Sequence, residues 1–421
     1  MEFKNSKEFA ALLDEKDELA HFQDKYHFPR RNNRKSIYFC GNSLGLQPKQ
    51  TKQFIDAELT NWAENGVEGH FIKPQPWVEH SDLTKESLSK LVGSELHEVV
   101  SMNNLTTNLH LMLASFYYPK GKRSKILIEK GAFPSDHYAV ESHIKRLGLD
   151  PKEHMVTLAP SEGYNFSTKE IVDKIAELGE ELALVMFPGV QYYSGQFFDM
   201  KALSQAAHEV GAYAGFDLAH AMGNLPMNLH DDDVDFATWC SYKYLNSGPG
   251  GTSGVFVHEK HSSNPAFPKL TGWWGHALSH RFEMDNNFTP AFGVDAWMLS
   301  NLNILPMAAH RASLDLFDQA GIMKLREKSI LLTGFLEHLL TTDEILKNKT
   351  TIISPSNPND RGCQLSVEVE GGKEIFNSLI KAGVILDWRE PGVIRLAPTP
   401  MYNSFLDVWE FITILKEVYA K

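Results

Sequence analysis

Two residues near the middle of the chain could do chemistry together. Lys243 lies between two tyrosines in CSYKYLNSGPGG (240–251), and Asp217 directly follows the apolar run YAGF. A lysine is most often a surface residue, and an aspartate after a strand often caps a helix, so neither residue alone indicates a site. Together they supply an amine for a Schiff base and a carboxylate for a protonated ring nitrogen, the two groups that a pyridoxal phosphate enzyme requires. The pair therefore predicts a site for that cofactor.

The segments around this pair alternate between strand-like and helix-like patterns. Short apolar runs typical of buried strands occupy 125–133, 182–190, 212–220, 235–244 and 254–259. Apolar residues at helical spacing occupy 134–149, 167–180 and 199–211. This alternation predicts an α/β fold with a mainly parallel sheet that helices cover on both faces. Ligands of such sheets bind beyond the carboxyl ends of the strands, where Asp217 and Lys243 are expected.

The patterns divide the chain into three parts. We expect a helical arm at 1–35, a large cofactor-binding α/β domain at 36–305 and a small α+β domain at 306–421. The C-terminal part begins in a long amphipathic pattern at 303–341 and ends in a helix at 404–420, with strand-like runs between them. The predicted fold class is thus α/β, with a second, smaller α+β unit at the C-terminus.

The composition is that of a folded globular protein and disfavours several classes of partner. Hydrophobic residues make up 43% of the 421 residues, and the net charge of −12 repels nucleic acids and anionic membranes. The N-terminal stretch MEFKNSKEFAALLDEKDELAHF lacks the apolar core of a secretory signal, and no apolar run approaches a membrane span of roughly 20 residues. The three cysteines, Cys40, Cys240 and Cys363, form no disulfide or zinc motif. We therefore expect a cytoplasmic protein without a metal, nucleic-acid or membrane partner.

A phosphate-binding element is also indicated. In MNNLTTNLHLMLASF (102–116), Thr106, Thr107 and Asn108 precede an apolar helical run, and a helix N-terminus can bind phosphate through hydroxyls and N–H groups. A simple helix cap predicts the same residue types, so both interpretations stay open. The turn SGPGG (247–251) lacks the Lys-Ser/Thr pair of a nucleotide P-loop and is interpreted as a tight turn beside the candidate lysine.

Eight stretches of the sequence resemble one enzyme family. They are YFCGNSLGLQP, MNNLTTNLHLMLASF, AFPSDHYAVES, GFDLAHAMGN, CSYKYLNSGPGG, GWWGH, RFEMDN and IRLAPTPMYNSF. In this order and spacing they closely resemble kynureninase, a family with the fold of the pyridoxal phosphate enzymes related to aspartate aminotransferase. The resemblance covers the chain from about residue 36 to the C-terminus.

The resemblance implies roles for the residues of a cofactor pocket. Lys243 would form the Schiff base, Asp217 would hold the pyridine nitrogen, and Tyr242 would contact the phosphate and transfer protons. The other implied cofactor contacts are Leu105, Thr106, Phe133, Asp136, His220, Asn301 and, from a neighbouring subunit, Trp273. Pro188 stands where some relatives have a small hydroxyl residue that helps to bind the cofactor, so that contact is open in this chain.

The resemblance also implies a substrate. Ser43, His70 and Asn301 would face it, and the guanidinium fork of Arg395 would pair with its α-carboxylate. The expected reaction is hydrolysis of L-kynurenine or 3-hydroxy-L-kynurenine to anthranilate or 3-hydroxyanthranilate plus L-alanine, by a homodimer, in tryptophan catabolism or NAD biosynthesis. His70, Ser300 and Asn301 resemble members that prefer 3-hydroxykynurenine, since polar side chains can hydrogen-bond to its ring hydroxyl.

Other proteins of this fold would share part of the pattern. A cysteine desulfurase or a small aminotransferase would also need Lys243 and Asp217. Cys363 is the one candidate in the C-terminal third for a desulfurase's reactive thiol, although its strand-like surroundings favour an ordinary core residue. A silent scaffold would not need Lys243, Asp217 and Tyr242 together, so their presence favours an enzyme.

Several of the implied residues also have ordinary structural interpretations. Trp273 could pack in a core or an interface, and Asp136 could stabilise the dipole of a helix N-terminus. Arg395 could form a structural ion pair, and His70 could be a plain loop residue. Without the resemblance, the core or interface interpretation of Trp273 would be favoured.

Overall fold

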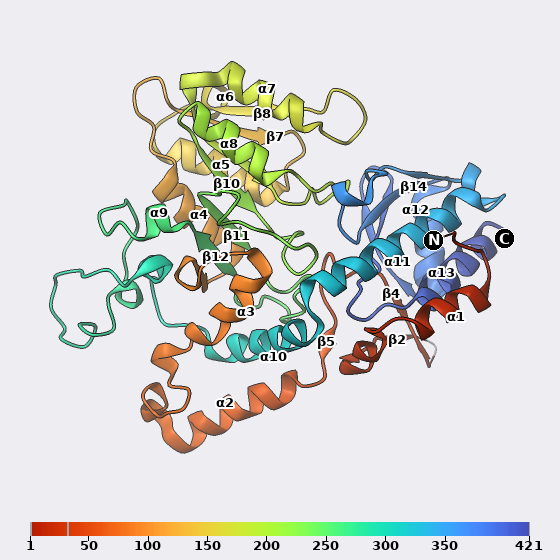
Figure 1. Ribbon diagram of the computed structural model, residues 1–421, viewed down its shortest axis with the longest axis horizontal. Helices are drawn as coiled ribbons and strands as arrows, with labels where there is room; N and C mark the ends of the chain where they lie inside the picture. The colour runs from red at the N-terminus through yellow and green to blue at the C-terminus, as the bar shows by residue number, and fades with distance from the viewer. Residues whose placement is uncertain (1, 32, 421) are drawn as a thin grey trace.

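The computed structural model describes residues 2–31 and 33–420, so Met1, Asn32 and Lys421 lie outside the described residues. Within this part of the chain, a seven-stranded sheet forms the centre of the larger part of the molecule (Figure 1). Its order is β6-β12-β11-β10-β9-β7-β8, with β6 Val99–Ser101, β7 Lys125–Glu129, β8 Met155–Leu158, β9 Leu182–Pro188, β10 Tyr213–Asp217, β11 Phe236–Trp239 and β12 Gly254–Val257. Strand β12 is antiparallel to both of its neighbours, β6 and β11. The other five strands, β11, β10, β9, β7 and β8, pair in parallel, each with the next in this order. The prediction of a mainly parallel sheet is confirmed.

Helices cover both faces of this sheet. Because both faces are buried, successive residues of one strand enter different cores, as Leu184 and Val185 of β9 do. Helices α4 (Leu105–Phe116) and α5 (Pro134–Arg146) cover one face, and α3 (Asp82–Val92), α7 (Thr168–Leu178) and α8 (Met200–Glu209) cover the other. The same region contains α2 (Thr51–Asn65), α6 (Pro151–His154), α9 (Glu259–Ser262) and α10 (Ile304–Ala320).

A second, antiparallel sheet lies in the C-terminal part. Its order is β13-β14-β17-β16, with β13 Thr350–Ile352, β14 Leu365–Val369, β16 Asp387–Arg389 and β17 Val393–Leu396. It packs against α11 (Ile322–Thr342), α12 (Gly372–Lys381) and α13 (Phe405–Tyr419). The predicted α+β character of this part is confirmed. No helix in the described part of the chain is long and apolar enough to cross a membrane.

The N-terminal segment packs onto this C-terminal unit (Figure 1). Helix α1 (Lys7–Glu15) adds Leu13 to the C-terminal core, and the carboxylate of Asp14 accepts the backbone N–H groups of Phe405 and Leu406 at the start of α13. Strand β4 (Ile37–Tyr38) adds to the contact by pairing with β15 (Val384–Ile385). Two other short pairs lie within the N-terminal part, β1 (Tyr26–His27) with β5 (Gln47–Pro48) and β2 (Arg30–Arg31) with β3 (Arg34–Lys35). The predicted arm is thus joined to the C-terminal core, and the predicted domain boundaries stay a prediction.

Two local features differ from the sequence prediction. The strand expected at 235–244 ends at Trp239, so Lys243 lies in the loop that follows β11. The amphipathic pattern at 303–341 is interrupted at Gly321, whose φ of +77° ends α10 and redirects the chain into α11. Neither difference moves Lys243 away from the carboxyl end of the central sheet.

Candidate active site

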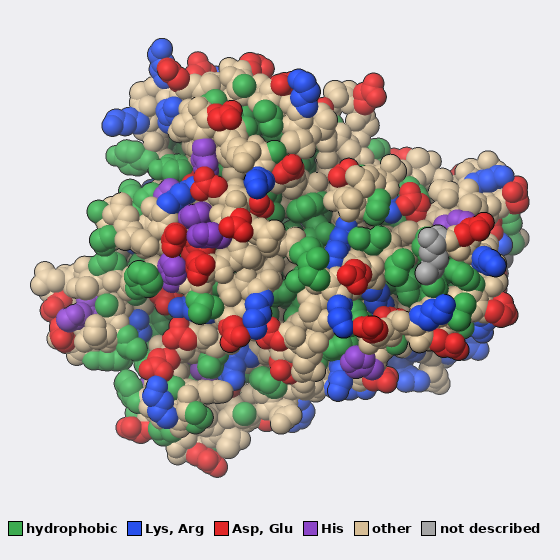
Figure 2. Space-filling model, viewed as in Figure 1, with side chains coloured by type: hydrophobic (Ala, Val, Ile, Leu, Met, Phe, Trp, Pro, Cys, Tyr) green, Lys and Arg blue, Asp and Glu red, His purple; other side chains and the backbone are tan. Residues whose placement is uncertain are grey.

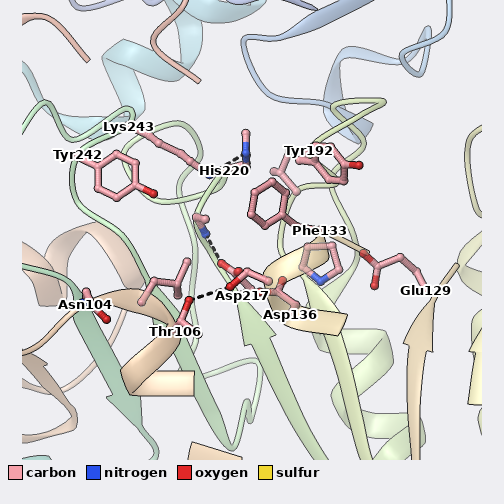
Figure 3. A pocket seen from close by; sticks show the side chains of 15 residues that line it. Asn104, Thr106, Glu129, Phe133, Asp136, Tyr192, Asp217, His220, Tyr242 and Lys243 are labelled. Carbon is pink, nitrogen blue, oxygen red and sulfur yellow. Dashed lines mark hydrogen bonds between the residues drawn. The ribbon is translucent and has the colours of Figure 1, made fainter. Parts of the chain in front are cut away.

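A cavity of about 390 Å³ lies at the carboxyl ends of β7, β9 and β10 (Figure 3). Its walls are formed by Asn104, Leu105, Thr106, Glu129, Phe133, Ser135, Asp136, Pro188, Val190, Tyr192, Asp217, Ala219, His220, Tyr242 and Lys243. The fold therefore brings together all the predicted cofactor residues except Trp273 and Asn301.

Asp217 and Lys243 both face this cavity. Asp217 ends β10, and its carboxylate accepts the N–H of Ala219 at 2.7 Å. The Nζ of Lys243 lies 2.9 Å from Nε2 of His220 (Figure 3). Burial raises the pKa of Asp217, and the positive charge of Lys243 opposes that rise. Because Asp217 lines the cavity, a positively charged group bound there could pair with its carboxylate.

A glycine holds the lysine loop in place. The N–H of Gly45 donates to the backbone oxygen of Tyr242 at 2.8 Å. A Cβ at Gly45 would lie 2.3 Å from the backbone oxygen of Lys243, so only glycine allows this close approach. The N-terminal loop thus packs directly on the residues that carry the candidate chemistry.

Two further acids share the cavity with Asp217. Burial, and then the negative charge of Asp217, raise the pKa of Asp136 well above its ordinary value. Burial raises the pKa of Glu129 to about 8. A pKa of about 8 leaves Glu129 mostly protonated at neutral pH, and the raised pKa of Asp136 favours its protonated form in the same way.

His220 is a neutral imidazole in this environment. Burial lowers its pKa well below the ordinary value, and the charges of Lys243, Arg395 and Arg389 lower it further. Its Nδ1 is buried and has no hydrogen-bond partner among the described residues. A neutral ring at this point can contact a planar ligand and can hydrogen-bond to the lysine without adding charge.

Two helix N-termini, those of α4 and α5, lie at the cavity. Asn104 caps α4 through its side chain, and Thr106 follows in the first turn of that helix. The hydroxyls of Thr106 and Ser135 are 2.8 Å apart, which links the starts of α4 and α5. Helix N-termini favour phosphate through free N–H groups and the helix dipole. The phosphate-site interpretation of this segment gains support from its place in the cavity.

Aromatic side chains line the opposite wall. The ring of Phe133 is 41% exposed, and its centroid lies 5.7 Å from Nζ of Lys243. Tyr192 packs edge-on against it, with the ring centroids 5.2 Å apart. Burial raises the pKa of Tyr242, so its phenol stays protonated and can donate a proton. A planar ring bound in this cavity would lie against Phe133.

These residues fit pyridoxal phosphate. The cofactor needs an amine, an anion for its ring nitrogen, a phosphate site and a surface for its ring. Lys243, Asp217, the start of α4 and Phe133 supply them in one cavity.

Arg395 lies just behind this cavity in an ion pair. Its Nη1 donates to the backbone oxygen of Tyr192 at 2.8 Å, and its Nη2 donates to the hydroxyl of Ser43 at 2.9 Å. Nη2 also donates to the carboxylate of Asp387, which accepts the Ser43 hydroxyl as well. The ion pair that the sequence left open as an ordinary role for Arg395 is present, and it adjoins the cavity wall.

His70, Trp273 and Asn301 lie outside the cavity of their own chain. Trp273 is 44% exposed, and its ring is 5.7 Å from that of Phe282. Phe282 is 5.5 Å from Phe71, the neighbour of His70. Asn301 is also exposed. We call His70, Phe71, Trp273 and Phe282 the aromatic patch. Two of the predicted site residues, His70 and Trp273, therefore belong to this patch and not to the cavity that contains Lys243.

Glu129, Tyr192 and Ser135 line the cavity although the sequence did not single them out as site residues. Glu129 could have been found by the rule that indicated Asp217, because both are acids that directly follow an apolar strand. Tyr192 lies in a loop after β9, and no local pattern marks it.

Glu98, His230 and His258 form a cluster whose side chains could hold a metal ion. Their polar atoms already have partners. Glu98 accepts the N–H groups of Glu95 and Glu259 and lies 3.0 Å from Nδ1 of His230. Nδ1 of His258 accepts the N–H of Lys260 at 3.2 Å. The cluster is therefore a structural hydrogen-bond network.

Comparison with known proteins identifies the family. Residues 325–415 match the model of the kynureninase C-terminal domain. The chain is 49% identical over 420 residues to a kynureninase of Flavobacterium johnsoniae, with 99% of each chain covered. It is 48% identical over 414 residues to one of Xanthomonas oryzae pv. oryzae, with 97% of each covered. The chain belongs to the kynureninase family. The resemblance seen in the sequence motifs is confirmed.

Solved structures show how widely the fold of this kynureninase family member is shared. A cysteine desulfurase from Thermococcus onnurineus superposes with a TM-score of 0.74 at 17% identity, covering 92% of this chain and 95% of that one. The cysteine desulfurase CsdA from Escherichia coli gives 0.75 at 16% identity, covering 96% and 98%. At such identities the likeness shows the fold alone, and the predicted fold class is confirmed.

Cys363 separates this chain from a desulfurase. Its thiol is fully buried beside Tyr244, and burial raises its pKa to about 12. A desulfurase needs an accessible thiolate, and this thiol is neither accessible nor ionised at neutral pH.

Proposed function

We propose that the protein hydrolyses L-kynurenine and 3-hydroxy-L-kynurenine to anthranilate or 3-hydroxyanthranilate and L-alanine, with pyridoxal phosphate as cofactor. Kynureninases that match along nearly the whole chain support the reaction. The observation that carries the proposal is the shared cavity of Asp217 and Lys243, which also contains the start of α4.

In this proposal the chain's residues divide the work of binding. Lys243 holds the cofactor aldehyde, Asp217 keeps its ring nitrogen protonated, and the hydroxyls of Thr106 and Ser135 bind its phosphate. The bound cofactor supplies a sink for the electrons released at the substrate's α-carbon. Arg395 receives the α-carboxylate.

Two side chains move protons. The amine of Lys243 is the base that removes the proton from the substrate's α-carbon, and His220 orients it through the 2.9 Å contact. Tyr242 supplies a phenol that can donate a proton where the carbon–carbon bond breaks, because burial keeps it protonated. The pKa of Asp136 is raised further by the negative charge of Asp217, so of these two acids Asp217 is the one that can pair with the cofactor ring.

A fluorescence assay of anthranilate release from kynurenine tests this function. The wild-type protein and the Lys90→Ala control, which changes an exposed lysine of α3, should release anthranilate at equal rates. Lys243→Ala should remain folded and release essentially none. Anthranilate release by Lys243→Ala at the wild-type rate, or none from the wild type loaded with cofactor, would show that the proposal is wrong.

We also propose a homodimer in which the aromatic patch of one subunit faces the cavity of the other. Phe71, Trp273 and Phe282 are 53%, 44% and 46% exposed, and contiguous apolar surface of this kind marks an interface. A two-fold dimer would return His70 and Trp273 to a cavity that they do not reach within their own chain.

Mixed subunits test this arrangement. Trp273→Ala and Lys243→Ala are each expected to be nearly inactive, but a hybrid dimer has one site with both residues intact. Random exchange of subunits should therefore restore about a quarter of wild-type activity, since half of the dimers are hybrids with one good site. No gain on mixing, or an active monomer in light scattering, would contradict the proposal.

Three polar residues bear on substrate preference in this proposal. We propose that His70, Ser300 and Asn301 favour 3-hydroxykynurenine, because an unpaired buried polar group costs about 1–3 kcal/mol, or roughly 5- to 150-fold in kcat/KM. Competition between the two substrates measures this ratio, which should shrink in His70→Phe and Asn301→Ala. Equal use of both substrates by the wild type would contradict the proposal.

We infer a cytoplasmic enzyme that acts in tryptophan catabolism or NAD biosynthesis. Support comes from the expected substrate and from three cysteines that are all free thiols, as in a reducing compartment. Cell fractionation with an antibody to the protein tests the location, and recovery in a membrane or secreted fraction would contradict it.

A further inference from the structure

We propose that Asp387 is a resident counter-ion of Arg395, that the substrate's α-carboxylate replaces it there, and that Arg389 receives the displaced Asp387. This inference rests on the proposed role of Arg395 in binding the substrate. It adds two positioning residues, Asp387 and Arg389, that act on the substrate through Arg395.

Three donors converge on one carboxylate oxygen. Asp387 and Arg395 face each other across the β16–β17 pair. The Oδ2 atom of Asp387 accepts from Nη2 of Arg395, from the hydroxyl of Ser43 and, at 3.2 Å, from Nη2 of Arg389. The carboxylate of Asp387 thus already contacts both Arg395, which it would leave, and Arg389, which would then bind it.

The cluster adjoins the reacting end of the cavity. Arg395 donates to the backbone oxygen of Tyr192, and the ring of Tyr192 packs on Phe133 in the cavity wall. The charges of both arginines also reach the buried His220, whose Nε2 is 2.9 Å from Nζ of Lys243. An amino acid bound at the lysine would therefore place its carboxylate near these two guanidinium groups.

The cluster lacks one negative charge. Two guanidinium groups share the single carboxylate of Asp387, and the side chain of Arg395 is only 1% exposed. Nε of Arg389 and Nε of Arg395 are both buried without a hydrogen-bond partner in the described part of the chain. A buried cation with unused donors is costly, so a second carboxylate would balance the charge and satisfy these donors.

The geometry of a guanidinium makes this an exchange. A carboxylate that binds Arg395 through two parallel hydrogen bonds on its open side uses Nε and Nη2. The two N–H groups of Nη2 now donate to Asp387 and to Ser43, so the substrate has to displace one of them, and the inference assigns that place to the carboxylate. Arg389 can bind the displaced Asp387. Its Nη2 already donates to that carboxylate, and its Nε has no hydrogen-bond partner among the described residues.

The two residues should have opposite effects on substrate binding. Asp387→Asn removes the competitor and should lower KM for kynurenine about tenfold, with kcat within about threefold of wild type. Arg389→Gln removes the guanidinium group that would bind the displaced carboxylate, and it should raise KM about tenfold. In the double variant the effect of Arg389→Gln should disappear, because no displaced carboxylate is left. Glu390→Gln, an equal charge change at an exposed neighbour, is the control and should not alter KM.

A binding measurement separates this inference from the proposed function. Calorimetric titration of the cofactor-loaded protein with L-alanine should show tighter binding in Asp387→Asn, and titration with L-alaninamide, which has no carboxylate, should show no change. If Asp387→Asn weakens alanine binding and lowers the melting temperature, Asp387 is a structural residue and the inference fails. It also fails if Arg389→Gln keeps its effect in the double variant. A protein that shows the predicted alanine split but releases no anthranilate would overturn the proposed reaction and leave the exchange standing.

Discussion

Two buried aspartates at opposite ends of the central sheet differ in how many donors surround their carboxylates. Asp217, at the carboxyl end of β10, accepts the backbone N–H group of Ala219 and a hydrogen bond from the side chain of Asp136. Asp235, just before β11, accepts from the N–H of Ala214, from His208 and His261, and from Lys260. Figure 2 shows histidines among acidic and basic side chains on the face near α9, where this second cluster lies.

The protonation equilibria of the two aspartates follow from this difference. Burial opposes ionisation at both sites, but the hydrogen bonds from His208 and His261 lower the pKa of Asp235, whereas the pKa of Asp217 stays raised. A carboxylate whose donors are all within the protein stabilises the fold. A buried carboxylate with few hydrogen-bond donors can instead bind a ligand that carries a positive charge.

The largest expected effect is the loss of catalysis on replacing Asp217, the aspartate with fewer hydrogen-bond donors. Asp217→Ala should lower kcat/KM for kynurenine at least about 1,000-fold, or ~4 kcal/mol, because the cofactor ring loses its counter-ion. Its urea midpoint should not fall, since the wild-type carboxylate is poorly satisfied. Asp231→Ala, at an exposed aspartate, is the control. Normal turnover by Asp217→Ala would remove the distinction between the two sites.

The next largest effect is on stability at the other site. Asp235→Asn should lower the free energy of unfolding by about 3–5 kcal/mol at pH 7 and leave the kcat of the folded enzyme unchanged. Because its pKa is lowered by folding, Asp235 stabilises the protein above about pH 4, and this stability is lost as the pH falls. Urea titrations at pH 7 and pH 3 should thus show a difference between variant and wild type that shrinks in acid. A constant difference would contradict the charge-based explanation.

Glu129 should show the opposite pH dependence. Its pKa of about 8 is above that of an unfolded glutamate, so the folded state loses stability as the pH rises from 5 to 8. In cofactor-free protein, Glu129→Gln should remove this loss, which amounts to about 3 kcal/mol. Urea titrations of both proteins across this range measure it. Parallel pH profiles would mean that Glu129 is ionised in the cavity.

The smallest effect concerns one donor of the saturated site. Lys260 is partly exposed and lies 3.0 Å from Asp235, so Lys260→Gln should cost only about 1 kcal/mol of unfolding free energy. Thermal unfolding of Lys260→Gln, Asp235→Asn and the double variant measures the coupling between the two residues. Additive effects would show that Lys260 does not stabilise the Asp235 carboxylate.

The sequence predicted the site where the signals are local. Asp217 follows an apolar strand and Lys243 follows another, and the rule for parallel sheets then places both at one edge. Strands β6 and β8 were not predicted, because β6 has only three residues and β8 is not a fully buried apolar run, unlike β11 and β12. The strand before Lys243 was predicted too long, since CSYKY continues the apolar run beyond Trp239.

Contacts between distant segments could not be predicted. The four donors of Asp235 come from three elements, α8, β10 and α9, and no spacing in the sequence marks them. The pairing of Asp387 with Arg395 depends on the register of β16 and β17, and a shift by one residue would separate them. The union of α1 with the C-terminal core likewise depends on packing between the two ends of the chain.

Chemical labelling tests most directly whether the cavity of Asp217 and Lys243 is the cofactor site. Borohydride reduction fixes a carbonyl cofactor on the amine that holds it, and peptide mass spectrometry then locates that amine. We predict that the purified protein loses its visible absorbance on reduction and carries one added cofactor mass on the peptide that contains Lys243, with Lys260 unmodified. Label on Lys260 or on any other lysine, or a cofactor mass that is absent from the Lys243 peptide, would contradict the assignment of this cavity.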